Sequence, residues 1–124
     1  MILDSDVIIE VLRGNSATIG WLRIQKAAGV SLRYSPVSRA EIRAGSRAAE
    51  RSAIAALFGS LAALPIEAST GEVAGEQLAK FARSHGVQMG DALIAGAALE
   101  REDDLATFNA KHFPGVRRIV EPDR

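Results

Sequence analysis

Short apolar segments alternate with longer segments of helical character along the 124-residue chain. The short segments show little alternation of apolar and polar residues, which is typical of strands buried on both faces of a parallel sheet. The longer segments carry apolar residues at helical spacing, such as Ile54, Phe58 and Leu61. This order predicts an α/β fold: a single domain over residues 1–124, with a parallel sheet of about five short strands and helices on both faces.

The expected elements can be assigned to residue ranges. We expect strands at residues 1–4, 30–34, 64–66, 105–108 and 116–120. We expect helices at residues 7–13, 16–28, 38 onward, 48–63, 69–85 and 92–101. Ser5 or Asp6 is the expected cap of the first helix. Ser38 is expected to open the third helix, with Glu41 as its capping-box partner.

The composition excludes several kinds of site. The chain has no cysteine, so disulfides, zinc–thiolate sites, iron–sulfur clusters and thiol catalysis are excluded. Its two histidines, His85 and His112, are too few for a histidine-rich zinc site. The basic and acidic residues number 15 each, which argues against broad, non-specific nucleic-acid binding but allows a local basic patch.

Neither a membrane span nor a secretion signal is expected. No apolar stretch approaches the roughly 18 residues that a membrane span needs. The first residues, Met1 to Asp4, lack the basic and apolar regions of a signal peptide. We therefore expect a cytoplasmic protein with no membrane association.

Oxygen-bearing side chains fall where the ends of the expected strands would gather. Asp4 ends the first strand, Asn109 follows the fourth, Glu41 lies early in the helix after the second, and Asp91 opens a helix. In open parallel sheets, sites form at the carboxyl ends of the strands, at a topological switch point. Two carboxylates about 4 Å apart repel by about 4 kcal/mol at an effective dielectric constant of about 20. A hard divalent cation, Mg²⁺ or Mn²⁺, would remove that repulsion.

Each acid also has an ordinary structural interpretation. Asp4 and Asp91 are placed as helix caps, and Glu41 as the capping-box acid for Ser38. Asp6 is expected either to cap the first helix or to support the site from behind. The acids indicate a metal site only because they occur together on this predicted topology.

Five segments occur in order along nearly the whole chain: ILDSDVIIEVLRG, PVSRAEIRAG, GDALIAGAAL, LATFNAKHF and PGVRRIVEP. Together they resemble a PIN-domain ribonuclease, and most closely the VapC toxins of bacterial toxin–antitoxin pairs. Each segment alone is a weak signal, whereas the matched set is specific. The fold that the resemblance implies, a parallel sheet of about five strands flanked by helices, agrees with the fold predicted above.

The resemblance also implies roles for single residues. The family's first three acids fall on Asp4, Glu41 and Asp91, which are the expected metal ligands and catalytic acids. Ser5 matches a small hydroxyl residue that supports the site. The fourth catalytic position, often Asp in the family, is Asn109 here, and the place three residues later, where relatives with Asn often carry an acid, is His112. An amide in place of an acid leaves the contribution of a fourth ligand open.

The resemblance implies a metal-dependent endoribonuclease, the toxin of a type II toxin–antitoxin pair, that cleaves RNA phosphodiesters with a water activated by Mg²⁺ or Mn²⁺. Its expected partners are RNA, a cognate antitoxin and a second copy of the chain, with toxin–antitoxin hetero-oligomers. A degenerate PIN domain that binds RNA or antitoxin without cutting is one alternative. A haloacid-dehalogenase-like phosphatase is another, because Asp4-Ser5-Asp6-Val7 fits its signature, although no lysine or late acid pair stands where that class needs it.

A second candidate feature is basic. Arg39, Arg43, Arg47 and Arg51 recur every fourth residue, which in one continuous helix would form a basic stripe. Phosphate contacts by Lys and Arg dominate RNA affinity, so Arg39, Arg43 and Arg47 are candidate RNA-binding residues. Contact with the antitoxin, or a solvated face paired with nearby acids, would explain the same pattern.

Overall fold

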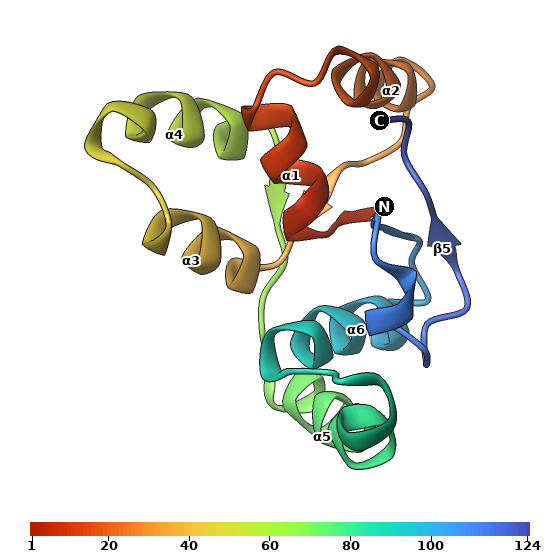
Figure 1. The fold of residues 1–124 in the computed structure, drawn as a ribbon. Coiled ribbons are helices and arrows are strands. Elements are labelled where there is room, and N and C mark those ends of the chain that lie inside the picture. The colour runs from red at the N-terminus through yellow and green to blue at the C-terminus, as the bar shows by residue number, and fades with distance from the viewer.

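The structure is a computed structural model that describes residues 1–124, and its centre is a five-stranded, all-parallel sheet in the order β3-β2-β1-β4-β5 (Figure 1). Every strand is only two residues long. The strands are β1 (Ile2–Leu3), β2 (Arg33–Tyr34), β3 (Ala62–Ala63), β4 (Leu105–Ala106) and β5 (Ile119–Val120). The predicted α/β class and parallel sheet are confirmed.

The sheet has a topological switch point between β1 and β4. From β1 the chain builds outward through β2 and β3, and it then crosses back to add β4 and β5 on the other side. Leu3 pairs in register with Ala106, so the residues that follow, Asp4 and Thr107, leave adjacent strands side by side. The crevice at this switch point is the place where ligands bind in open parallel sheets.

Helices cover both faces of the sheet. They are α1 (Ser5–Leu12), α2 (Ser16–Ala27), α3 (Pro36–Ala44), α4 (Arg51–Gly59), α5 (Ala68–His85) and α6 (Met89–Arg101), with two 3₁₀ turns, η1 (Ala48–Glu50) and η2 (Ala110–His112). Figure 1 shows α5 and α6 lying together on one side of the molecule, away from α2 and α4. None of the six α-helices combines the length and the apolar character that a membrane span requires.

Adjacent residues of β1 belong to two separate hydrophobic cores because successive side chains of a strand point to opposite faces of the sheet. Leu3 packs in the core formed with α1, α2, α3 and α4, which includes Phe58. Ile2 packs in the core formed with α6 and β4, which includes Ile94 and Leu105. Each fully buried aliphatic side chain contributes about 1.5–3 kcal/mol, so both cores anchor the short β1 in place.

The helix pair α5–α6 packs with little space between its backbones. A Cβ built on Gly96 of α6 would lie 2.9 Å from the carbonyl oxygen of Thr70 in α5. The residues that surround Gly96 are small and buried, among them Ala95 and Ala97. The close approach therefore depends on glycine at this position.

Three local predictions are wrong in detail. The third strand is Ala62–Ala63 rather than residues 64–66, because Ala62 N–H donates to Leu32 O and continues the ladder of β2. The first helix begins at Ser5 with Asp4 as its cap, so neither Ser5 nor Asp6 is the cap. The third helix begins at Pro36 with Ser35 as its cap, which leaves Ser38 inside the helix and Glu41 outside any capping box.

Candidate active site

Asp4 lies in the crevice between β1 and β4. The residue is 8% exposed, and its carboxylate accepts two hydrogen bonds. Oδ1 accepts from the backbone N–H of Ser5 at 2.8 Å, and Oδ2 accepts from the hydroxyl of Thr107 at 2.7 Å. The chain fixes the position of this carboxylate from both strands that border the switch point.

Asp6 forms a second layer behind Asp4. Its Oδ2 accepts from Phe108 N–H at 3.0 Å and lies 3.3 Å from Thr107 Oγ1. Its Oδ1 is buried with no hydrogen-bond partner. Asp6 therefore ties the start of α1 to the segment after β4 and does not cap the helix, and its support of a site stays a prediction.

The electrostatics of this pair are unfavourable to negative charge. The pKa of Asp4 is raised to about 7: burial contributes most to the rise, the charges of Asp6 and Asp91 add to it, and hydrogen bonds from Thr107 and Ser5 oppose it. Burial also raises the pKa of Asp6, against the hydrogen bond from Phe108 N–H. No Lys or Arg side chain forms an ion pair with Asp4 or Asp6.

Glu41 approaches the same region from α3. Ser5 Oγ lies 2.8 Å from Ser38 Oγ and 3.4 Å from Glu41 Oε1. A Cβ built on Gly90, at the start of α6, would lie 3.4 Å from Glu41 Oε1. The Glu41 carboxylate thus lies between the first turn of α1 and the first turn of α6.

Asp91 lies in the first turn of α6. Its Oδ2 accepts from Gln88 N–H at 3.1 Å in a capping box, so the helix-capping interpretation of Asp91 is confirmed as a contact. The other carboxylate oxygen has no hydrogen bond within the chain. Asp91 can therefore cap α6 and still present an oxygen to the crevice.

Asn109 and His112 close the crevice from the segment after β4. Asn109 N–H donates to Thr107 Oγ1 at 3.0 Å, and its Nδ2 lies 2.8 Å from His112 Nδ1. The same ring nitrogen lies 3.8 Å from Asp91 Oδ2. His112 therefore lies between Asn109 and Asp91.

Thr107 was not expected to belong to the site. Its hydroxyl lies within hydrogen-bond distance of both Asp4 and Asp6 and accepts from Asn109 N–H. The only sequence signal was a hydroxyl residue just after an apolar strand, which is too common to single out. The strand register, set by residues a hundred positions apart, is what brings Thr107 to Asp4.

The crevice has the donor chemistry of a site for a hard cation. Its available side chains offer oxygen rather than sulfur, and its acids are short of compensating charge. No three His, Asp or Glu side chains already surround one point at ligand distances. Asp4, Glu41 and Asp91 border the crevice without enclosing an ion, so the arrangement fits Mg²⁺ or Mn²⁺ in chemistry and not yet in geometry.

The fold and this crevice can now be compared with known proteins. The model of the PIN domain family matches residues 1–119. The chain belongs to the PIN-domain family. Ribonuclease VapC10 of Mycobacterium tuberculosis is 37% identical to this PIN domain over 123 residues, which cover 98% of the chain and 92% of the relative. Ribonuclease VapC19 of the same organism is 29% identical over 122 residues, 98% of each chain.

Solved structures share the fold of this PIN domain. VapBC2 from Rickettsia felis, bound to a DNA fragment from its promoter, aligns with a TM-score of 0.79 at 20% identity over 96% of this chain and 94% of that chain. DNA-bound VapBC from Salmonella typhimurium aligns with a TM-score of 0.75 at 21% identity, over 95% and 92% of the two chains. The resemblance to VapC proteins is confirmed, and it replaces the phosphatase alternative.

The arginine stripe is not continuous. Helix α3 ends at Ala44, so Arg39 and Arg43 lie on α3 while Arg47 lies in the connection to η1. Arg47 is exposed and pairs with Glu50 at 3.2 Å. The continuous helix that a basic stripe would require is therefore absent, because the helical period stops at Gly45.

Proposed function

We propose that this PIN domain is a metal-dependent endoribonuclease, the toxin of a type II toxin–antitoxin pair. The observation that carries the proposal is the buried carboxylate of Asp4 at the switch point, surrounded by further acids without compensating charge. The similarity to two proteins named ribonucleases gives the reaction class. RNA phosphodiesters are the proposed substrate.

Asp4, Glu41 and Asp91 would hold the ion, Mg²⁺ or Mn²⁺, with Asn109 at the fourth position. When bound, such an ion supplies Lewis-acid polarisation of the phosphodiester and lowers the pKa of the attacking water. Thr107 and the Ser5 N–H fix the Asp4 carboxylate, and Asp6 holds the segment after β4 against α1. Ser5 and Ser38 lie where they can orient the Glu41 carboxylate.

The test is cleavage of a fluorophore-labelled RNA by purified protein with and without metal. We expect cleavage to stop in EDTA and to return with Mn²⁺ or Mg²⁺. Asp4→Asn and Asp91→Asn should abolish cleavage because each removes a ligand charge and keeps the side-chain shape. Glu76→Gln, an exposed position on α5, is the matched control and should cleave as the wild type does.

The outcomes separate this proposal from its alternative. RNA binding by a folded wild type that does not cleave in any metal would favour the degenerate PIN domain. Undiminished cleavage in EDTA would contradict metal dependence. Circular dichroism of each variant keeps loss of fold apart from loss of chemistry.

We also propose a cognate antitoxin and a second copy of the chain as partners. The support is that a structural neighbour of this fold is a toxin–antitoxin complex from Klebsiella pneumoniae. The mass of the purified chain in solution tests the second copy, since a monomer has 13.1 kDa and a dimer twice that. A monomer at all concentrations would contradict the homodimer.

A further inference from the structure

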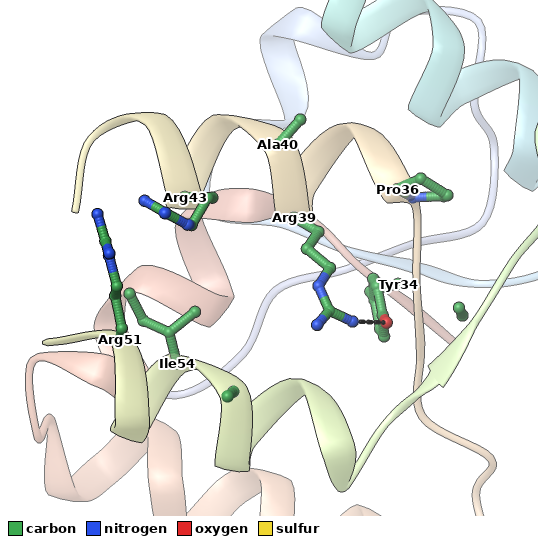
Figure 2. A pocket seen from close by; sticks show the side chains of 9 residues that line it. Tyr34, Pro36, Arg39, Ala40, Arg43, Arg51 and Ile54 are labelled. Carbon is green, nitrogen blue, oxygen red and sulfur yellow. Dashed lines mark hydrogen bonds between the residues drawn. The ribbon is translucent and has the colours of Figure 1, made fainter. Parts of the chain in front are cut away.

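A groove of about 700 Å³ lies between α3 and α4, beside the carboxyl ends of β2 and β3 (Figure 2). Three arginines line it: Arg39 and Arg43 from α3, and Arg51 from the first turn of α4. Figure 2 shows Arg43 and Arg51 at one end of the groove, with Arg39 reaching across it toward Tyr34. These three arginines, which are separated by multiples of four residues in the sequence, come together because the chain turns between α3 and α4. They do not lie on one helix.

None of the three guanidinium groups has an acidic partner. The ion pairs of this protein involve other basic groups, and Arg39, Arg43 and Arg51 form none. In a chain with no net charge, three unpaired guanidinium groups around one groove are a local excess of positive charge. Such an excess is an anion-binding surface.

The Arg39 guanidinium is partly fixed in position by two aromatic side chains. Its guanidinium donates to the Tyr34 hydroxyl at 3.0 Å and lies 5.3 Å from the centre of the Phe58 ring. A guanidinium has five N–H donors, so most of them remain available after the contact with Tyr34. A partly fixed arginine loses less entropy on binding a phosphate than a free one does.

The rest of the groove is apolar. Pro36, Ile54 and Ala63 contribute to its lining. A nucleotide presents a charged phosphate beside the flat apolar face of a base, and this groove offers guanidinium groups beside an apolar surface. The carboxylates of an acidic peptide would leave that apolar part of the groove unused, so the lining favours RNA over an acidic protein segment.

The groove and the acid crevice lie on the same edge of the sheet, on opposite sides of α3. Residues two positions apart on a helix point about 200° apart, so Glu41 and Arg43 face opposite ways. Glu41 faces the crevice, and Arg43 lines the groove. Helix α3 is about 10–12 Å in diameter with its side chains, so one RNA strand that crosses it would reach both the crevice and the groove.

We infer that the groove lined by Arg39, Arg43 and Arg51 is a phosphate subsite that holds the RNA strand on the far side of α3 from the bond being cut. The inference rests on the proposed function, since it names a second contact with the same substrate. It assigns no such role to Arg47, which lies outside the groove and pairs with Glu50.

The test is RNA affinity, measured in EDTA so that binding is separate from cleavage. The probe is a fluorescein-labelled single-stranded RNA of about 12 nucleotides, read by fluorescence anisotropy. The test variant is Arg43→Ala with Arg51→Ala, both exposed positions whose loss leaves the contacts of Arg39 in place. The matched control, Arg23→Ala with Arg117→Ala, removes the same charge from exposed positions outside the groove.

Each lost contact to a single strand should lower the salt slope by about 0.7 and the affinity at 0.1 M salt about fivefold, so the test variant should bind about 25-fold more weakly. The control and Arg47→Ala should bind within about twofold of the wild type. In metal, the test variant should raise KM for long RNA with kcat kept, because the groove contributes uniform binding. An RNA too short to cross α3 should show no difference.

The failures are distinguishable. A wild type that neither binds nor cleaves RNA would remove the proposed function and this inference with it. A wild type that cleaves, with the test variant and the control equal in affinity, would overturn the subsite alone. An oligoglutamate peptide that binds the wild type and not the test variant, while RNA affinity is unchanged, would assign the groove to an acidic protein partner and overturn the subsite as well.

Discussion

The hydroxyl of Thr107 donates to Asp4 Oδ2 at 2.7 Å, and the two residues each follow one member of the register pair Leu3–Ala106. Parallel pairing therefore sets the geometry of the crevice directly, without an intervening loop. The same hydroxyl accepts from Asn109 N–H at 3.0 Å, so the Thr107 side chain joins Asp4 to the backbone of Asn109.

Thr107→Val should impair both the site and the fold. It keeps the shape of the side chain but leaves Asp4 Oδ2 and Asn109 N–H without their partner, at a cost of about 1–3 kcal/mol of unfolding free energy. Cleavage should fall at least tenfold at a given Mn²⁺ concentration. Urea unfolding and cleavage rates measure the two effects, and Thr107→Ser, which keeps the hydroxyl, should restore most of both. Cleavage by Thr107→Val at the wild-type rate would contradict a role in fixing Asp4.

Asn109 tests how charge controls metal affinity. An amide oxygen is a neutral ligand, so Asn109→Asp adds a fourth negative charge to the crevice and should lower the Mn²⁺ concentration needed for half-maximal cleavage. Asn109→Ala should impair cleavage far less than Asp91→Asn, since it removes a dipole rather than a full charge. Cleavage rate against metal concentration compares the three variants. Equal loss in Asn109→Ala and Asp91→Asn would show instead that the amide orients water or phosphate.

Gly96→Ala should destabilise the fold without touching the site. The added methyl group would meet the carbonyl oxygen of Thr70 at 2.9 Å, and forcing α5 and α6 apart should cost about 1–3 kcal/mol. Gly75→Ala, in a helical position of α5 with open space around it, is the matched control and should be neutral or stabilising by up to about 1 kcal/mol. Thermal unfolding compares the two, and equal melting temperatures would rule out the close contact.

Glu100 should contribute stability that depends on pH. Hydrogen bonds from Thr70 at 2.5 Å and Ser69 at 2.8 Å, together with Arg101, hold the pKa of Glu100 below its ordinary value of 4.5. A lowered pKa in the folded state means that this stability is present above pH 4.5 and is lost as pH falls through the folded pKa. Glu100→Gln should therefore destabilise the protein at pH 7 and much less near pH 3, as followed by urea unfolding across that range. A destabilisation that does not change with pH would contradict this linkage.

The sequence allowed the parallel α/β class to be predicted because buried strands and helices leave different periodicities. It also predicted that Asp4, Glu41 and Asp91 lie near one edge of the sheet, where all three border the crevice, and their roles as metal ligands stay a prediction. Ser35 as the cap of α3 was available from the sequence, since Pro36 directly after it is a typical first helical residue. The position of the third strand could not be predicted from the sequence, because Ala62 and Ala63 are exposed and pair through backbone groups alone.

The remaining features of the site depend on contacts between distant parts of the chain. The shared hydroxyl of Thr107 arises from pairing between β1 and β4, and the approach of His112 to Asp91 arises from the turn after β4. The four arginines do not share one helix because α3 ends at Ala44, and their regular four-residue spacing gives no sign of that end. Local patterns specify elements, whereas these contacts follow from their assembly.

Helix α3 separates the acid crevice, which Glu41 borders, from the groove that Arg43 lines, and its buried residue Ile42 anchors it to the core. A substitution at Ile42 would tilt Glu41 and Arg43 together. In a mutational scan such a position would score as severely as an active-site residue although it contacts no substrate. Loss of activity after a substitution at a buried position of α3 therefore reports on the alignment of the crevice with the groove. Only substitutions at exposed positions of α3 test the crevice and the groove separately.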